Sequence, residues 1–437
     1  MQTIVIAGGG AGGLELATRL GDRLGRRRRA RIVLIDRSPT HVWKPLLHEV
    51  ASGKLDPQVH QVEYSAQAAH HHFEFVHGEV MSVDRTAQAI DIGACHGGDG
   101  SEHQPGRKLH YDKLVLAFGA VTNFFGIAGA AEHSMTLDSV DQAEQFRQRL
   151  VALCVQKGIR RETGIEPDAK VNVVIVGAGA TGVELAAELH HTAHALAKYN
   201  IHALDPARDV RIRIVERGDR ILPQLDAKLA RNAEQYLRSL GIEVCTASGV
   251  AKVTSDAVHD EAGNVHASDI TLWAAGVEGP QVCATLGLRL NRLRQVLVGP
   301  SLQTVDDPKV FAIGDCSSHV CSVNGTVIPP RAQAAHQQAV FLATVLGESD
   351  EKCLPHFQYR DYGSLVSLGP FVAVGVLIGR LGKFGSRGVV VDGMLARVLY
   401  RLMYRKHVLV LHGFVSMVAQ TLSHWLRGRL APPVKLH

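Results

Sequence analysis

The sequence predicts an α/β protein made of two similar βαβ units, the second inserted in the first, and three observations support this prediction. A glycine-rich motif occurs twice, at residues 5–17 and 174–186, each time between a short apolar run and a helical pattern. An acidic residue closes the next apolar run after each copy, and a further glycine turn at residues 304–316 follows the second unit. Because G-x-G-x-x-G between a strand and a helix is typical of dinucleotide binding, we expect two Rossmann-like dinucleotide-binding domains.

Three glycines of each motif have separate expected roles. The first makes the tight turn, the second lets the backbone approach a pyrophosphate, and the third lets the helix pack closely on the strand. In the two copies these are Gly8, Gly10 and Gly13, and Gly177, Gly179 and Gly182. The N-terminus of each helix then faces the phosphates with free N–H groups.

A carboxylate ends the second expected strand of each unit. Residues 31–36 and 211–216 end in Asp36 and Glu216, where each side chain can accept hydrogen bonds from an adenosine ribose. The stretch between motif and acid is longer in the second unit, which indicates an added turn or a longer helix. Because a carboxylate repels a 2′-phosphate, Glu216 favours NADH over NADPH, although Arg217 beside it weakens that preference.

Two more expected strands end in glycine turns that return the chain to a dinucleotide. They lie within residues 111–120 and 271–277. The turn residues expected at the cofactors are Ala117, Gly119 and Gly276. Residues 138–157 have a helical pattern that leads into the second unit, and residues 96–110, rich in glycine and histidine, are expected to form a surface loop.

The glycine turn after the second unit predicts a return to the first. Residues 310–313 form an expected strand that delivers Gly314 and Asp315 to a helix start. There the carboxylate can accept hydrogen bonds from the ribityl hydroxyls of a flavin, while backbone N–H groups face its phosphate or ring oxygen. The second unit is therefore expected to be an insertion in the first.

Composition limits the class of protein. With 437 residues, 46% of them hydrophobic, the chain is long enough for two or three domains with buried cores. An expected first strand from Thr3 leaves no room for a secretory signal, and seven cysteines without C-x-x-C favour free thiols in a reducing, cytosolic compartment. The histidines between residues 60 and 110 lack metal-ligand spacing, so no metal is expected, and the net charge of +5 is too mild to indicate a nucleic-acid partner.

Three further segments carry a family resemblance. Residues 41–53, 330–339 and 357–369 resemble the flavin-flanking, A-Q-x-A-x-Q and C-terminal segments of type II NADH:quinone oxidoreductases. Residues 1–345 as a whole resemble flavoproteins with two dinucleotide-binding domains. The A-Q-x-A-x-Q pattern falls at Ala332, Gln333, Ala335 and Gln337.

The resemblance implies a fold and an activity. It implies a discontinuous FAD-binding domain at 1–130 and 290–375, an NADH-binding domain at 165–289, and a membrane-associated C-terminal region at 376–437. NADH is then expected to reduce FAD by hydride transfer, and the reduced flavin to pass two electrons to a lipophilic membrane quinone without proton pumping. The protein supplies orientation, exclusion of water and electrostatics.

The resemblance also implies roles for single residues. Glu184 is expected near the nicotinamide and flavin, assisting proton movement, and Gln333 and Gln337 share a helix face from which both amides can reach one carbonyl-bearing ligand. Lys44 and Ala334 are expected at the cofactor. Two alternatives stay open: Glu184 in a first helical turn is favoured by the helix dipole alone, and the glutamines fit a solvent-facing helix. Glu15, at the same place as Glu184 in the first motif, is expected on the flavin side or as a helix cap.

The C-terminal region is expected to lie at a membrane. Apolar residues at helical spacing between 395 and 403 have a basic flank, Arg397, Arg401, Arg405 and Lys406. That pattern favours an anionic membrane surface, and polar residues interrupt the uncharged stretch 407–426, so a hairpin in the interface is expected rather than a spanning helix. The predicted location is the cytoplasmic face of the cell membrane. A helix packed on the protein itself, or on a partner in a homodimer, remains the alternative.

Two rival functions stay open at this point. A sulfide:quinone oxidoreductase has the same fold and could use Cys154, Cys316 or Cys353 to carry sulfur, although it needs no NADH site. A nucleotide-sensing flavoprotein without significant turnover is the other rival. In that protein the A-Q-x-A-x-Q segment would have no purpose.

Overall fold

The computed structural model describes residues 1–96, 102–198, 205–321, 325–348, 354–369, 372–377 and 389–394, and single positions between 396 and 421. The chain divides into two compact units. Unit 1 contains residues 1–44, 60–121 and 277–360, and unit 2 contains residues 45–59, 122–276 and 361–437. Along the chain, the longest segment of unit 2, residues 122–276, lies between two segments of unit 1.

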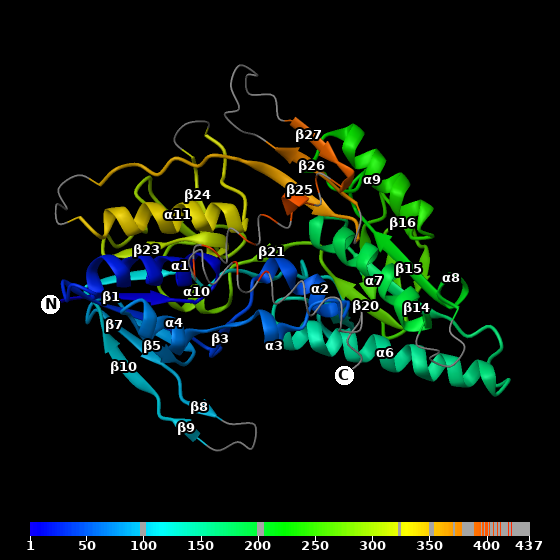
Figure 1. The fold of residues 1–437 in the computed structure, drawn as a ribbon, viewed down its shortest axis with the longest axis horizontal. Helices are drawn as coiled ribbons and strands as arrows, with labels where there is room; N and C mark the ends of the chain where they lie inside the picture. The colour runs from blue at the N-terminus through cyan, green and yellow to red at the C-terminus, as the bar shows by residue number, and fades with distance from the viewer. Residues whose placement is uncertain are drawn as a thin grey trace. The chain divides into compact units, whose positions relative to one another are not determined.

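Unit 1 is built on a five-stranded parallel sheet in the order β23-β11-β1-β2-β5 (Figure 1). These strands are β1 (Gln2–Ala7), β2 (Ala30–Asp36), β5 (Glu74–His77), β11 (Lys113–Leu116) and β23 (Val310–Ala312). The helices α1 (Ala11–Leu20) and α11 (Ala332–Val345) pack against each other. The centre of β1 is an unbroken apolar run, Ile4 to Ile6, that is fully buried, as expected for a parallel strand covered on both faces.

Unit 2 repeats this plan with the strand order β13-β20-β14-β15-β16, again all parallel. The strands are β13 (Ser134–Met135), β14 (Val171–Val176), β15 (Val210–Val215), β16 (Glu243–Cys245) and β20 (Ile270–Trp273). Its longer helices are α6 (Val140–Glu162), α7 (Ala180–Lys198) and α9 (Ala227–Ser239). In both units the strand before the glycine motif, β1 or β14, lies at the centre of the sheet. The next long strand in the chain, β2 or β15, pairs with it on one side. This order confirms two Rossmann-like sheets.

Among the described residues, three antiparallel sheets have three strands each. They are β6 (Val80–Asp84), β7 (Ala89–Ile92) and β10 (Arg107–His110) in unit 1, and β17 (Val250–Val253), β18 (Ala257–Asp260) and β19 (Val265–Ala267), then β25 (Gly363–Ser367), β26 (Ala373–Leu377) and β27 (Val389–Asp392), in unit 2. The expectation of a surface loop over residues 96–110 was wrong in part, because β10 pairs along its length with β7. Residues 97–101 lie outside the described residues.

Short elements connect these sheets and helices. They are η1 (Gly21–Gly25), β3 (Thr40–His41), η2 (Lys44–Leu46), α2 (Leu47–Ala51), α3 (Pro57–His60), β4 (Val62–Glu63), α4 (Tyr64–His70), β8 (Cys95–His96), β9 (Glu102–Gln104), β12 (Val121–Thr122), α5 (Ala130–His133), α8 (Pro206–Asp209), β21 (Val277–Glu278), α10 (Val282–Thr285), β22 (Val296–Val298), η3 (Gly314–Cys316) and β24 (Ser317–His319).

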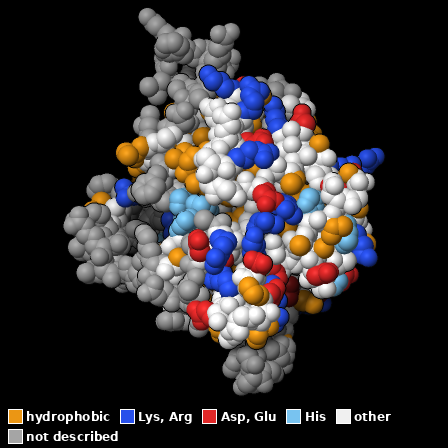
Figure 2. All heavy atoms as spheres, turned by 90° about the vertical axis from the view of Figure 1, so that its right-hand side faces the viewer, with side chains coloured by type: hydrophobic (Ala, Val, Ile, Leu, Met, Phe, Trp, Pro, Cys, Tyr) orange, Lys and Arg blue, Asp and Glu red, His pale blue; other side chains and the backbone are white. Residues whose placement is uncertain are grey.

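Much of the expected membrane-associated region, including Leu395, Arg397, Arg401, Met403, Lys406 and most of 407–426, lies outside the described residues. Among the helices that are described, none combines the length and the apolar content needed to cross a bilayer. On the face drawn in Figure 2, Lys and Arg side chains lie among Asp and Glu side chains, so this face carries charges of both signs.

Candidate functional site

The first glycine loop joins β1 to α1 in unit 1. Gly8 has a φ of +108°, and a side chain there would collide with the backbone of Ala117. A Cβ at Gly13 would collide with the carbonyl oxygen of Gly8, so only glycine lets α1 pack this closely. At Gly10, the N-cap residue of α1, an added Cβ would meet nothing within 4 Å. The loop thus leaves open space in front of the free N–H groups of a helix N-terminus, which fits a dinucleotide pyrophosphate.

Asp36 closes this loop from the end of β2. Its Oδ2 accepts from the N–H of Gly9 at 2.6 Å and its Oδ1 from the N–H of Ser38 at 2.8 Å. Burial raises the pKa of Asp36, while the bonds from Ser38 and Gly9 lower it. The carbonyl of Gly9 accepts a bond from the Tyr64 hydroxyl at 2.7 Å and lies 3.0 Å from Nδ1 of His41. The sequence did not single out Tyr64 or His41 as loop partners, although His41 begins the segment 41–53 that resembles a flavin-flanking segment.

The remaining candidate residues of unit 1 gather at the ends of β11 and β23. These strands are neighbours, so the turn with Ala117 and Gly119 lies beside the turn with Gly314 and Asp315. Gly119 and Gly314 have φ of +72° and +68°. Lys44 donates from Nζ to the carbonyl of Ala120 at 2.8 Å. Burial raises the pKa of Asp315, and the charge of Lys44 lowers it, so this cation and carboxyl act on one another.

One detail of this region differs from the sequence prediction. Asp315 does not begin an α-helix: it lies in the single 3-10 turn η3, and β24 follows at once. The long helix of this region, α11, begins at Ala332. Its Gln338, which the sequence analysis did not single out, accepts from the N–H of Gly314 through Oε1 at 2.7 Å. The sequence signal for Gln338 was its place among several amide side chains in the expected helix.

Helix α11 also holds the A-Q-x-A-x-Q residues. Ala334 is buried, and Gln333 and Gln337 lie one turn apart, as predicted. The amide of Gln337 bonds the backbone of Arg360 twice, donating from Nε2 to the carbonyl at 2.8 Å and accepting from the N–H at 3.0 Å. Gln337 therefore joins α11 to the segment that leads to β25, and one of its N–H groups remains for a ligand.

The buried Glu15 also joins elements, in this case α1 and α11. Its carboxylate pairs with Arg19 at 2.8 Å and with Nδ1 of His336 at 2.6 Å. The N-terminus of α1 has no side-chain cap, so the capping role expected for Glu15 was wrong.

The second glycine loop, in unit 2, has the same construction. Gly177 has a φ of +104°, and a Cβ there would lie 2.7 Å from the carbonyl oxygen of Ala274. A Cβ at Gly182 would collide with the carbonyl oxygen of Gly177, whereas Gly179 has nothing within 4 Å. This loop also has room for a pyrophosphate.

Glu216 bonds the backbone of the second glycine loop, as Asp36 bonds that of the first. Its Oε2 accepts from the N–H of Ala178 and its Oε1 from the N–H of Gly218, both at 2.7 Å. Gly276, in the turn after β20, leaves room for the ring of Phe125, whose Cζ would lie 2.7 Å from an added Cβ. The second set of predicted residues is thus brought together around one loop.

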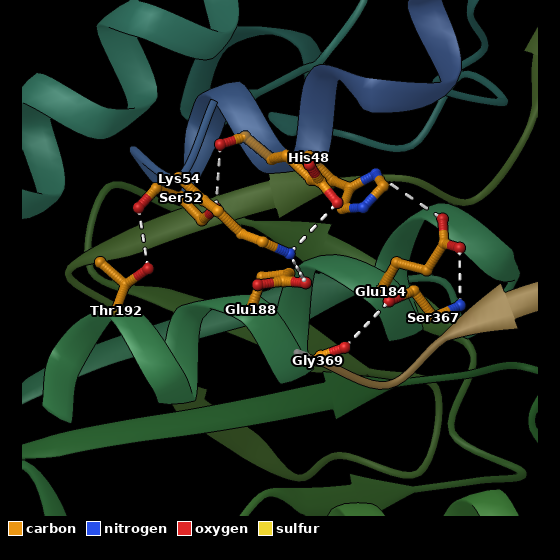
Figure 3. Close-up of polar contacts among 9 residues, drawn as sticks. His48, Ser52, Lys54, Glu184, Glu188, Thr192, Ser367 and Gly369 are labelled. Carbon is orange, nitrogen blue, oxygen red and sulfur yellow. Dashed lines mark hydrogen bonds and ion pairs between the residues drawn. The ribbon is translucent and has the colours of Figure 1, made fainter. Parts of the chain in front are cut away.

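Glu184 follows this loop in α7 and is buried, with 6% of its surface exposed. Its Oε1 accepts from the N–H of Ser367 at 2.9 Å, and its Oε2 lies 3.6 Å from Nδ1 of His48 (Figure 3). Burial raises the pKa of Glu184 to about 8. A carboxyl group with this pKa can hold or release a proton near neutral pH.

The thiols show no sign of activation. Burial raises the pKa of Cys154 to about 12 and that of Cys316 further still. Cys353 lies outside the described residues. In the described part of the chain, no group of three His, Cys, Asp or Glu side chains could hold a metal ion.

Comparisons with known proteins agree with this geometry. The family model for pyridine nucleotide-disulphide oxidoreductases matches residues 2–339. The type II NADH:quinone oxidoreductase of Haemophilus influenzae is 38% identical, with 100% of both chains covered, and that of Mycobacterium tuberculosis is 28% identical over 96% of this chain and 86% of its own. The structure of NDH2 from Plasmodium falciparum in complex with NADH has a TM-score of 0.81 at 19% identity, covering 99% of this chain and 100% of that one.

Proposed function

The chain belongs to the pyridine nucleotide-disulphide oxidoreductase family as a type II NADH:quinone oxidoreductase, and from that premise we propose that unit 1 holds FAD, unit 2 holds NADH, and the electron acceptor is a lipophilic membrane quinone. The observation that carries the assignment is the pair of glycine loops, each with open space before a helix N-terminus and a fixed carboxylate beside it. Two such loops fit two dinucleotides. The proposed reaction involves no proton pumping.

In unit 1, the loop around Gly10 holds the FAD pyrophosphate and Asp36 the adenosine ribose. The turns after β11 and β23, with Lys44, Ala117, Gly119, Gly314, Asp315 and Ala334, hold the rest of the cofactor. When bound, the flavin supplies the means of accepting a hydride from NADH and of passing two electrons on to a quinone. The proposed FAD-binding domain comprises residues 1–130 and 290–375.

In unit 2, the loop around Gly179 holds the NADH pyrophosphate, and Glu216 holds the ribose and repels a 2′-phosphate. Gly276 lies in the turn that passes the nucleotide. The proposed NADH-binding domain comprises residues 165–289. Glu184 holds a proton near neutral pH and gives it up during turnover, which its buried position and raised pKa support.

The quinone is proposed to meet α11. The amide of Gln333 and the remaining N–H of Gln337 lie one turn apart on this helix, so both can bond a quinone carbonyl. The contacts of Gln337 with Arg360 fix its side chain, which orients that N–H.

The C-terminal region, residues 376–437, is proposed to hold the enzyme on the cytoplasmic face of the cell membrane as a peripheral, monotopic protein. Among its described positions, Met394, Val398, Leu402 and Leu409 are apolar and exposed, and Ala396, Tyr400 and Leu411 are buried. A segment that buries one set of side chains and exposes a second apolar set fits an interfacial anchor. The same exposed side chains would serve a homodimer, which we keep as the alternative.

An anaerobic visible spectrum of the detergent-purified protein tests this proposal. A flavin band should be present, bleach quickly on addition of NADH and return on addition of a short-chain quinone. NADPH and sulfide are parallel reductants. Bleaching by sulfide and not by NADH would show a sulfide:quinone oxidoreductase instead, and bleaching without reoxidation would favour a nucleotide-sensing role.

A further inference from the structure

Glu184 belongs to a group of polar side chains in unit 2, most of which are buried (Figure 3). His48 comes from α2, Glu184 and Glu188 from α7, and Lys54 from the turns after α2. His48, Glu184 and Glu188 are all at most 6% exposed. Three buried ionisable side chains in one place are costly to fold, which indicates a function beyond packing.

The imidazole of His48 is the unusual member of this group. Its Nδ1 lies 3.6 Å from Oε2 of Glu184, too far for a hydrogen bond but within about 0.5 Å of one. Its Nε2 is buried and has no hydrogen-bond partner among the described residues. Leaving such a buried atom unsatisfied is costly, so a water molecule or another proton-carrying partner is expected there.

The other two carboxylates near His48, those of Glu49 and Glu188, both pair with Lys54. Nζ of Lys54 lies 2.7 Å from Glu188 and 3.2 Å from Glu49. The fixed ammonium of Lys54 thus engages both carboxylates in ion pairs. Glu184 and His48 remain as the exchanging pair.

The overall reaction requires one solvent proton in each turnover. NADH delivers a hydride, which is two electrons and one proton, whereas the quinol product gains two electrons and two protons. The second proton must therefore come from water. If Glu184 donates a proton from its buried position, its carboxylate must be reprotonated before the next turnover.

We propose that His48 returns a proton from water to Glu184 after each quinone is reduced. The Nδ1–H bond of His48 breaks as the O–H bond of Glu184 re-forms, and Nε2 takes a proton from a hydronium ion of the solvent, which becomes water. The imidazole stays neutral but passes from its Nδ1–H to its Nε2–H tautomer, and proton exchange with solvent restores the first tautomer before the next turnover. This inference rests on the proposed function of Glu184. His48 acts through Glu184 and is a positioning and relay residue.

The charges around the pair are consistent with this direction. Burial lowers the pKa of His48, Glu49 and Glu188 raise it, Lys54 lowers it again, and a bond with the backbone of Pro45 raises it. For Glu184, burial and the charges of Glu49 and Glu188 raise the pKa, while bonds from Ser367 and Tyr400 lower it. A neutral imidazole beside an acid of pKa about 8 carries protons without trapping them.

The test is His48→Gln, which keeps a polar side chain of similar reach but cannot titrate. Stopped-flow spectroscopy separates flavin bleaching by NADH from reoxidation by a short-chain quinone. Because reprotonation follows quinone reduction, we expect the first reoxidation in His48→Gln to keep about its wild-type rate. Repeated turnover with excess NADH and quinone should slow at least about tenfold, and its rate should rise with the concentration of buffer acid. Thr192→Val is the matched control, because it removes only the 2.8 Å bond from Thr192 to the carbonyl of Ser52 in the same part of unit 2.

Chemical rescue separates a relay from a structural role. In His48→Ala, substituted imidazoles should restore repeated turnover with rates that depend on the pKa of the imidazole, which filling a cavity does not require. Repeated turnover of His48→Gln at the wild-type rate, or a rescue independent of imidazole pKa, would overturn the relay. Failure of the wild-type flavin to bleach with NADH would instead overturn the proposed function, so the two failures are distinguishable.

Discussion

At the scale of single residues, Asp36 and Glu216 perform the same task in the two units. Each ends the strand after a glycine motif, and each carboxylate accepts two backbone N–H bonds, one of them from its glycine loop. These bonds fix the carboxylate without neutralising its charge. A ribose hydroxyl can still donate to a remaining lone pair, whereas a 2′-phosphate meets a negative charge.

Glu216→Gln should therefore change the choice of nucleotide. The amide keeps one acceptor oxygen for the loop but loses the charge, so we expect kcat/KM for NADH to fall about tenfold and the ratio of NADH to NADPH activity to fall more. Steady-state rates with each nucleotide measure both. An unchanged ratio would show that Glu216 does not face the ribose.

Glu184 should make stability depend on pH. Its ordinary pKa is 4.5 and burial raises it to about 8, so between these values the unfolded chain is ionised while the folded protein keeps the proton. Folded wild-type protein should therefore lose stability as pH rises from 4.5 to about 8, by up to the order of a few kcal/mol. Glu184→Gln lacks this loss and should gain melting temperature relative to wild type as pH rises. The difference between Thr192→Val and wild type should stay constant with pH, and the same behaviour in Glu184→Gln would contradict the raised pKa.

The positions whose local geometry matches the prediction have local signals. Gly8, Gly13 and Asp36 are defined by the spacing of one motif, because a turn, a helix and the next strand follow each other in the chain. Gln338 and His48 act on partners far along the sequence, Gly314 and Glu184. No periodicity or spacing reports such a pairing, so a single sequence could not reveal it.

At the scale of elements, each glycine loop combines two different demands. Gly182 is needed because α7 packs against the carbonyl of Gly177, whereas Gly179 faces open space. The fold requires a glycine at position 182. At position 179 a glycine is required only by the proposed nucleotide. These demands can be separated by substitution.

We expect Gly182→Ala to destabilise unit 2 by about 2 kcal/mol or more, because a rigid backbone oxygen occupies the place of the new methyl group. Gly179→Ala should shift the melting temperature by no more than about 2 °C but weaken NADH binding at least about tenfold. Thermal unfolding and titration of flavin bleaching measure the two effects. Loss of stability in Gly179→Ala with normal NADH binding would reverse the assignment.

Helix α11 offers a similar separation at the quinone. Gln333→Leu should slow reoxidation by quinone at least about tenfold while flavin reduction by NADH stays within about twofold, because it removes the amide that is proposed to bond the quinone carbonyl. Gln337→Leu removes its two bonds to Arg360 as well, so we expect it to lower the melting temperature in addition to slowing reoxidation. Stopped-flow measurement of each half-reaction is the readout. Equal loss in both half-reactions would remove the glutamines from the quinone site.

Element predictions failed where pairing between distant strands decides the structure. Residues 107–110 carry Arg, Lys and His, a composition typical of a loop, yet β10 pairs with β7 across an intervening hairpin. Antiparallel pairing satisfies backbone groups whatever the side chains are, so edge strands with polar residues have weak sequence signals. The long apolar strands β1 and β14 were found because parallel strands buried on both faces have strong ones.

At the scale of the whole molecule, the return of the chain to the first parallel sheet was predictable from the order of the motifs. The third glycine turn, Gly314 and Asp315, is apolar-flanked like the first two and lies beyond the second unit in the chain. Because β23 pairs with β11 of unit 1, the chain has to return across the insertion. No glycine motif marks the C-terminal region, whose proposed role depends on a membrane surface.

That role leads to the prediction for the intact enzyme at a membrane. Each basic residue near an anionic bilayer contributes about 1 kcal/mol, so the triple substitution Arg397→Gln, Arg401→Gln, Arg405→Gln should weaken binding to vesicles with anionic lipid by about 100-fold at low salt. Wild-type binding should weaken as salt rises, because the attraction is screened, and binding of the triple variant should depend little on salt. Vesicle co-sedimentation across a salt series measures both. Leu402→Asn is the matched apolar variant, since it keeps every charge and should weaken binding at all salt concentrations. If neither variant changes sedimentation but Leu402→Asn changes the oligomeric state, the exposed apolar side chains serve a dimer interface and not a lipid surface.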